Sequence, residues 1–307
     1  MKCYPDYYND FKCIADKCTH NCCIGWEIDI DPITLSFYKS HDGELKERFE
    51  KSINYCDIPH FITDENERCP FLNDKNLCDI IITLGEEHIC DICTQHPRFH
   101  NELPDRIESG LGLCCAEACR LILTKKEKVT LVSDEKYETD DEIILMRDEI
   151  IGILQNREHP LQKRVENMLD YCETNFEKSS LFDYANMLLS LEILDSSWEC
   201  TLKEIQSCDY EPDLSRFGEY IKGREHEYEQ FCVYLIYRHF ANAPELYYAQ
   251  QRARFTAFAF DFLYKLGAFM LQTKNEYKTE THLDFARMFS SEIEYSDENI
   301  YTLYDIL

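Results

Sequence analysis

The sequence predicts a mainly α-helical protein in which an N-terminal cysteine-rich metal-binding module with short strands is followed by a C-terminal helical domain. The chain has 307 residues with 20 Tyr and 18 Phe but only 9 Gly, and 44% of its residues are hydrophobic. This composition indicates a folded protein with few tight turns. Thirteen of the 17 cysteines lie between Cys3 and Cys119. We therefore expect a cysteine-rich module at residues 1–125 and a helical domain at residues 126–307.

Several short elements are expected in the first part. Between Trp26 and Ile30 apolar and acidic residues alternate, which is typical of a half-buried strand. Asp31 and Pro32 then have the residue types of a helix N-cap and a first helical position. An amphipathic helix, a tight hairpin and a loop that runs into a helix are expected at residues 44–53, 69–78 and 111–123.

The second part has the helical period throughout. A charged connection at residues 125–141 contains a brief strand-like stretch at 129–132. The helices expected after it lie at residues 142–155, 161–172, 181–194, 225–241 and 245–272, with shorter ones at 283–289 and 298–307.

The charge of the chain bears on its partners. The formal net charge is −27, so the surface repels nucleic acid phosphate and anionic lipid and favours a cationic partner such as a lysine-bearing protein. A general solubility role of this charge is the alternative. The start of the sequence lacks an apolar segment, and no run reaches the roughly 18 apolar residues of a membrane span. We expect a cytoplasmic protein that binds neither nucleic acid nor membrane and keeps its thiols reduced.

Nine of the cysteines fall into bunches that suit a soft metal better than disulfides or packing. They are Cys13, Cys18, Cys22, Cys23, Cys69, Cys78, Cys90, Cys93 and Cys115. Nine thiols exceed one tetrahedral zinc site, so one or two iron–sulfur clusters are the preferred interpretation, with one or two zinc ions as the alternative. A set of reduced thiols without metal also stays open. Nearby imidazoles could replace a thiolate, namely those of His20, His88, His96 and His100.

Polar residues beside these bunches are candidates for binding and catalysis. Arg98 and Arg120 each follow a bunch and could bind the carboxylate of a ligand, although surface ion pairs would explain them equally well. Glu117 is a candidate base. Tyr237 belongs to an aromatic and basic region that could receive a lysine ammonium group or could simply pack in the core.

One common cofactor site is not expected. The only Gly-x-Gly is Gly110-Leu-Gly112, and it lacks the third glycine of a Rossmann-type turn.

The order of the cysteines resembles that of a known family. The segments Cys13-x4-Cys18-x3-Cys22-Cys23-x-Gly-Trp, Cys69-Pro-Phe-Leu and Cys90-x-x-Cys93-x-x-His-Pro-Arg98 are similar to those of the flagellin lysine-N-methylase family. The same is true of Cys115-x-Glu117-Ala-x-Arg120. The N-terminal part also resembles a wider group of cysteine-cluster proteins described as zinc or iron chelators.

This resemblance implies transfer of a methyl group from S-adenosylmethionine to a lysine ε-amine of flagellin or a similar surface protein, with a 4Fe-4S or related iron–sulfur cluster. Arg98 and Arg120 would then contact S-adenosylmethionine, and Glu117 or Tyr237 would accept the proton of the lysine. Radical and polar transfer are both open. Two other functions remain possible: a metal-binding module that captures a basic client without catalysis, and an iron–sulfur enzyme that modifies another peptide.

Overall fold

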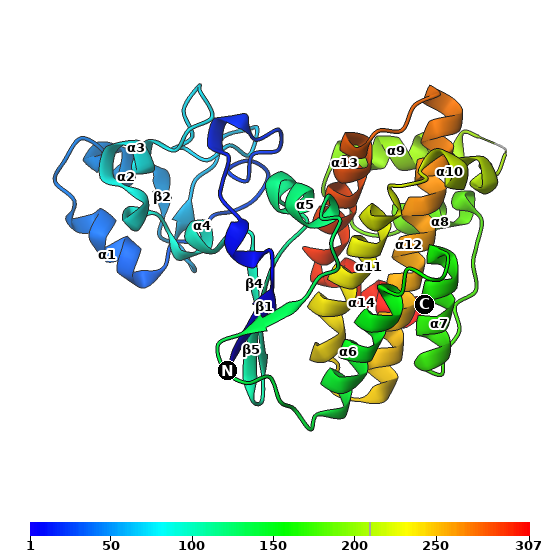
Figure 1. The fold of residues 1–307 in the computed structure, drawn as a ribbon. Helices are drawn as coiled ribbons and strands as arrows, with labels where there is room; N and C mark the ends of the chain where they lie inside the picture. The colour runs from blue at the N-terminus through cyan, green and yellow to red at the C-terminus, as the bar shows by residue number, and fades with distance from the viewer. Residues whose placement is uncertain (209) are drawn as a thin grey trace. The chain divides into compact units, whose positions relative to one another are not determined.

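The computed structural model describes residues 1–208 and 210–307, which divide into two compact units. Met1–Phe11 and His100–Leu307 form one unit, here called the helical unit, and Lys12–Phe99 form the other, here called the cysteine unit. The protein is mainly helical with a small sheet, as the sequence predicts (Figure 1).

The sheet of the helical unit explains why the first residues belong to it. Its strand order is β4-β5-β1-β6, formed by Arg98–Leu103, Arg106–Leu111, Lys2–Pro5 and Leu131–Ser133, and the first two residues of β4 still belong to the cysteine unit. Strand β1 pairs in parallel with β5 and antiparallel with β6. The N-terminal strand is therefore internal to the sheet, and the cysteine unit is an insertion between β1 and the hairpin β4–β5. The division thus falls at different residues from the boundary expected at 125.

Ten α-helices are described in the helical unit: α5 (Ala116–Leu123), α6 (Glu142–Leu154), α7 (Leu161–Tyr171), α8 (Leu181–Leu189), α9 (Ser196–Gln206), α10 (Leu214–Tyr220), α11 (Glu225–His239), α12 (Leu246–Lys274), α13 (Thr279–Phe289) and α14 (Asp297–Ile306). Helices α11 and α12 pack side by side and are buried on nearly all sides (Figure 1). Such burial needs apolar residues at most positions, and α12 accordingly has the most Phe, Tyr and Ala residues of the helices described. No helix among the described residues combines the length and the apolar character needed to cross a bilayer.

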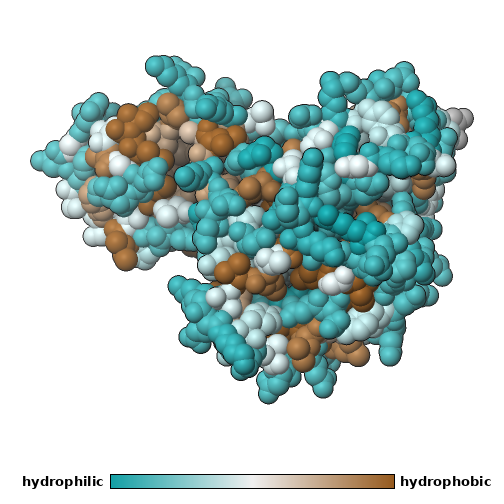
Figure 2. Space-filling view, in the orientation of Figure 1, coloured by the Kyte–Doolittle hydropathy of each residue, from teal (hydrophilic) through white to brown (hydrophobic). Residues whose placement is uncertain are grey.

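The cysteine unit is built from short elements: α1 (Pro32–Ser40), α2 (Lys46–Ser52), β2 (Ile53–Asn54), β3 (His60–Phe61), α3 (Asp79–Leu84) and α4 (Asp91–Gln95). Asp31 caps α1 as expected, because its side chain accepts a hydrogen bond from the Thr34 amide at 2.9 Å. Buried aromatic side chains of α1, α2 and β3 form much of its core, with Tyr38 and Phe49 stacked at 4.1 Å. Figure 2 shows apolar side chains gathered on the α2–α3 side of this unit, where Ile81 and Ile82 of α3 are exposed.

One expected strand is absent, and several elements of the structure were not expected. No strand forms at Trp26–Ile30, where a single isolated bridge joins Asp29 to His60. The alternation nevertheless buries Ile28 and Ile30, because an extended segment presents alternate side chains to the core even without a continuous ladder. Helices α9 and α10 and strands β1, β4 and β5 were not expected from the sequence.

Candidate functional site

Five of the nine cysteines proposed as ligands meet in the core of the cysteine unit. Cys69 and Cys90 are buried there, and Cys23, Cys78 and Cys93 are partly buried against the same core. We call these five residues the cysteine cluster. All of them are free thiols, so disulfides do not account for their proximity.

Local structure brings these thiols together from three segments. Cys69 and Cys78 stand at the two arms of the expected hairpin, whose turn is organised by Asn73 accepting hydrogen bonds from the amides of Lys75 and Leu77 at 2.9 and 3.2 Å. The Cys69 amide donates to the Cys23 carbonyl at 2.8 Å, which holds the first segment against the hairpin. The third segment begins at Cys90, the N-cap of α4.

The proximity of the thiols shifts their pKa values. Burial, which is opposed by a backbone hydrogen bond and assisted by the nearby Cys78 and Cys90, raises the pKa of Cys69 to about 11. A hydrogen bond to Cys90, then burial, then the charges of Cys90, Cys23 and Cys69 raise the pKa of Cys93. Thiolates packed this closely in an apolar core repel one another, and a bound cation would relieve that repulsion.

The thiols lie close together, but their side chains do not have the geometry of a metal site. Among the residues that the structure describes, no group of three or more His, Cys, Asp or Glu side chains is arranged to hold a metal ion. The donor chemistry of the cluster still fits a thiolate-bound iron–sulfur cluster or zinc, since its soft ligands sit in a core from which water is largely excluded.

Cys22 lies at the edge of the cluster and differs from it. A hydrogen bond from Cys23 lowers the pKa of Cys22 to about 7, although burial acts in the opposite direction. The indole of Trp26 donates to the backbone carbonyl of Cys22 and closes this turn. Cys22 therefore loses its proton more easily than the neighbouring Cys23, whose pKa is raised by the same hydrogen bond and by burial.

The other three proposed ligands are not brought into the cluster by the contacts described for them. The Cys13 sulfur accepts from the Ala15 amide at 3.5 Å, and the Cys18 thiol donates to the His20 carbonyl at 3.0 Å. Cys115 is the N-cap of α5 and belongs to the helical unit. Of the imidazoles, those of His88 and His96 pack on Phe37 and Trp26.

Arg98 is the proposed ligand-binding residue that belongs to the same unit as the cluster. It opens β4, and its guanidinium donates to the Thr94 carbonyl on α4 at 3.4 Å. Thr94 directly follows Cys93 in the sequence. Arg98 thus lies beside the helix that carries one thiol of the cluster.

Glu117 and Arg120 bind each other on α5. The guanidinium donates to the two carboxylate oxygens at 2.8 and 2.6 Å, and this pairing raises the pKa of Arg120. Both groups belong to the helical unit. For Glu117 to accept a proton or for Arg120 to bind a carboxylate, the pair would first have to open.

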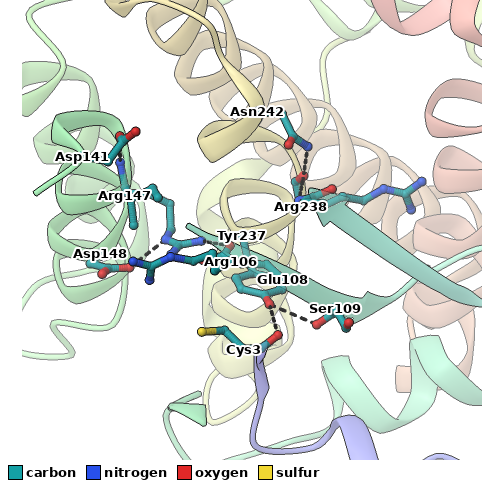
Figure 3. A network of polar contacts seen from close by, with 12 residues as sticks. Cys3, Arg106, Glu108, Ser109, Asp141, Arg147, Asp148, Tyr237, Arg238 and Asn242 are labelled. Carbon is teal, nitrogen blue, oxygen red and sulfur yellow. Dashed lines mark hydrogen bonds and ion pairs between the residues drawn. The ribbon is translucent and has the colours of Figure 1, made fainter. Parts of the chain in front are cut away.

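Tyr237 has a structural environment. Its side chain is buried on α11, and its hydroxyl donates to the backbone carbonyls of Ser109 at 3.0 Å and Cys3 at 3.4 Å (Figure 3). The guanidinium of Arg147 lies 5.4 Å from the centre of its ring. The hydroxyl therefore joins α11 to strands β5 and β1, and burial raises its pKa well above the usual value.

The rest of the aromatic and basic region is divided between core and surface. Arg252 stacks on the ring of Tyr304 at 3.4 Å, whereas Tyr247 and Tyr248 at the start of α12 are exposed and contact each other. The sequence did not indicate the buried ion pair of Arg147 with Glu108, because its partners are 39 residues apart.

The sequence has distant relatives among characterised proteins. Over 140 residues, or 43% of this chain, it is 26% identical to the flagellar biosynthetic protein FliU of Salmonella muenchen, and the match covers 83% of that protein. Over 149 residues, or 41% of the chain, it is 25% identical to the lysine-N-methylases of Salmonella choleraesuis and Salmonella typhimurium. That match spans 33% of the length of each methylase.

Two other comparisons gave nothing. No family model matches the chain, and no solved structure matches it. The family expected from the cysteine order is thus supported at the level of distant similarity to proteins named for lysine methylation and flagellar biosynthesis.

Proposed function

We propose that this protein transfers a methyl group from S-adenosylmethionine to a lysine ε-amine of a partner protein, flagellin being the first candidate. The observation that carries this proposal is the gathering of five free thiols in one core, in a chain similar to proteins named lysine-N-methylase.

The cysteine cluster would hold an iron–sulfur cluster, with zinc as the alternative metal. Cys23, Cys69, Cys78, Cys90 and Cys93 offer more thiolates than the three or four that one such cluster uses. An iron–sulfur cluster held by only three of these cysteines would leave one iron available to bind the amino and carboxylate groups of S-adenosylmethionine. Arg98, beside α4, is suited to pair with that carboxylate.

The chain must also deprotonate the lysine if the transfer is polar, because an ammonium group has no free electron pair. Desolvation favours the neutral amine and lowers its pKa. Glu117 could take the proton only after releasing Arg120. We assign no catalytic role to Tyr237, whose hydroxyl is engaged by two carbonyl oxygens.

Metal analysis and intact mass test the proposal together. Protein purified without oxygen should contain iron and acid-labile sulfide, and with S-adenosylmethionine it should add increments of one methyl group to a lysine-bearing protein. The triple variant Cys69→Ser/Cys78→Ser/Cys93→Ser leaves two of the five thiols, which is fewer than one cluster uses, and should lose both the metal and the methylation. Cys200→Ser is the control for replacing a thiol as such, because Cys200 is exposed on α9.

The results separate the alternatives. Zinc in place of iron would reject the iron–sulfur version, and methylation that survives loss of the metal would reject a catalytic role for the cluster. The acidic net charge of −27 favours a second function, capture of a basic client without chemistry. A client that binds without S-adenosylmethionine and keeps its mass would support that function instead.

A further inference from the structure

The cysteine unit contains a pocket lined by isoleucine, proline and aspartate residues. Its volume is about 460 Å³, and it is lined by three segments, Asp29–Pro32, Asp57–Pro59 and Asp91–Ile92. The first segment leads into α1, the second lies in the turn before β3, and the third opens α4. All three belong to the cysteine unit.

Hydrogen bonds fix the walls of this pocket relative to one another. The Ile30 amide donates to the Pro59 carbonyl at 2.7 Å, which joins the first wall to the second. The Asp31 carboxylate accepts from the Asp91 amide at 3.0 Å, which joins the first wall to the third. Because the walls are already held together, a ligand would not have to order them, and the free-energy cost of binding is reduced.

The apolar part of the lining suits an aliphatic chain. Ile30, Ile92 and the two prolines contribute carbon surface, and Ile58, also in the lining, is 62% exposed. An exposed isoleucine of this kind gains free energy when a ligand covers it.

The charged part selects a cation. Four of the nine lining residues are aspartates and none is Lys, Arg or His. Asp31 is occupied by the amides of Thr34 and Asp91. The carboxylates of Asp29, Asp57 and Asp91 take part in no hydrogen bond or ion pair with the residues that the structure describes.

We propose that this pocket binds a lysine side chain of a partner protein, with the four methylenes on the isoleucines and prolines and the ammonium group among the aspartates. A lysine side chain has a long aliphatic stem and a compact cationic end, and it complements a pocket lined by isoleucine, proline and aspartate. Two of the lining residues, Asp91 and Ile92, lie between Cys90 and Cys93 of the cysteine cluster. That this lysine is the one that is methylated rests on the function proposed above, whereas its binding does not.

Peptide binding tests the pocket without any methyl donor. The probe is a fluorescent pentapeptide with a central lysine, compared by anisotropy with the same peptide carrying Nζ-acetyl-lysine or norleucine, on the full chain. The lysine peptide should bind about tenfold more tightly than either analogue, a difference of about 1.4 kcal/mol.

The variant Asp29→Asn/Asp57→Asn/Asp91→Asn should abolish this preference, and Asp31 is left in place because it caps α1. The control Glu44→Gln/Glu50→Gln/Glu65→Gln removes the same number of negative charges from the same unit outside the pocket and should keep the preference. Asp57→Asn alone is the variant least disturbing to the fold, because Asp57 has φ +52° and Asn tolerates that conformation. This variant should bind the lysine peptide about threefold more weakly, a loss of about 0.7 kcal/mol in binding free energy.

Equal binding of the lysine and acetyl-lysine peptides would overturn the proposal, as would equal losses in the pocket and control variants, which would indicate attraction by net charge alone. Saturable binding of Ca²⁺ that depends on the three aspartates, without pocket-dependent peptide binding, would identify a metal-ion site and also overturn it. A protein that binds the lysine peptide in the pocket but methylates nothing would uphold this inference and reject the proposed enzyme. Methylation that persists unchanged in the triple variant would separate the pocket from the methylated lysine.

Discussion

Two residues of this protein show that hydrogen-bond partners limit what a polar side chain can do. Tyr237 and Glu117 both belong to types that accept protons in enzymes, yet both are engaged. Tyr237 donates to two backbone carbonyls, and Glu117 accepts from Arg120. A residue type suggests a role, but the hydrogen-bond partners determine whether the group is free to perform it.

The variant Tyr237→Phe tests this conclusion. It removes the hydroxyl but keeps the ring beneath Arg147, so we expect a loss of about 1–1.5 kcal/mol in the free energy of unfolding. Denaturant unfolding measures the loss, and methylation by the folded fraction should be unchanged. If the variant is as stable as the original chain but does not methylate, Tyr237 has a catalytic role.

His282 predicts a pH dependence of stability. It is fully buried on α13 against Tyr228 and Tyr277, and burial lowers its pKa to about 4, with Glu227 opposing the shift and Arg224 adding to it. The unfolded chain binds the proton near pH 6.5, so between about pH 6.5 and 4 it holds more protons than the folded chain. Stability is therefore lost as the pH falls through this window, by roughly 3 kcal/mol at its acid end.

The variant His282→Phe keeps the stacking on Tyr228 and removes the titration. Thermal unfolding at pH 7 and pH 4.5 should show a smaller loss than in the original chain. His159→Gln, at an exposed position, serves as the control and should leave the loss unchanged. An equal loss in both variants would show that other groups carry the pH dependence.

Pairs of elements are joined by polar contacts as well as by apolar packing. Arg147 of α6 donates to both oxygens of Glu108 of β5 at 2.6 and 2.9 Å, and both side chains are 0% exposed. Figure 3 shows this pair with Arg106, Asp148 and Tyr237 around it. The helices predicted from periodicity are thus attached to the sheet by residues that periodicity does not single out.

Replacing Arg147 by Met should destabilise the helical unit by about 3–5 kcal/mol, because the Glu108 carboxylate is left buried without a partner. The double variant Arg147→Met/Glu108→Leu should recover a large part of that loss. Chemical denaturation of the single and double variants measures the coupling. Lys46→Ala breaks an exposed ion pair with Asp42 and should leave the free energy of unfolding nearly unchanged, because solvent screens exposed pairs. Additive effects of the two buried substitutions would contradict the ion pair.

At the scale of the whole molecule, the chain leaves the helical unit after Phe11 and returns at His100. The cysteine unit is small, and much of its core is made of thiols and aromatic rings. A ligand that binds only the folded form stabilises the unit that holds it. A metal bound by the cysteine cluster would therefore stabilise residues 12–99 in particular.

Chelation should reveal this selectivity. Removing the metal from anaerobically purified protein should increase backbone hydrogen exchange in peptides from residues 12–99 and leave α11 and α12 protected. Exchange followed by mass spectrometry reports both regions in one sample. Equal loss of protection in the two units would contradict a metal site confined to the cysteine unit.

Much of the secondary structure was predictable, and the reason is local. The helix from Pro32 follows from its cap at Asp31, and the hairpin at 69–78 follows from the turn chemistry of Asn73. Spacing also indicated α6, α7, α11 and α12. Strand β1 was missed because it has only four residues and pairs with β5 and β6, which lie about 100 or more positions away in the sequence.

The sequence alone therefore determined the helical class, the positions of the principal helices and the concentration of cysteines in the first part, since these depend on composition and on contacts between near neighbours. Tertiary structure decided which cysteines meet in one core and that Cys115 belongs to another unit. It also decided that Glu117 and Tyr237 form hydrogen bonds with other groups. Finally, it brought together the three aspartate-containing segments that line one pocket. These outcomes depend on which distant segments come together, and a linear pattern of residues does not contain that information.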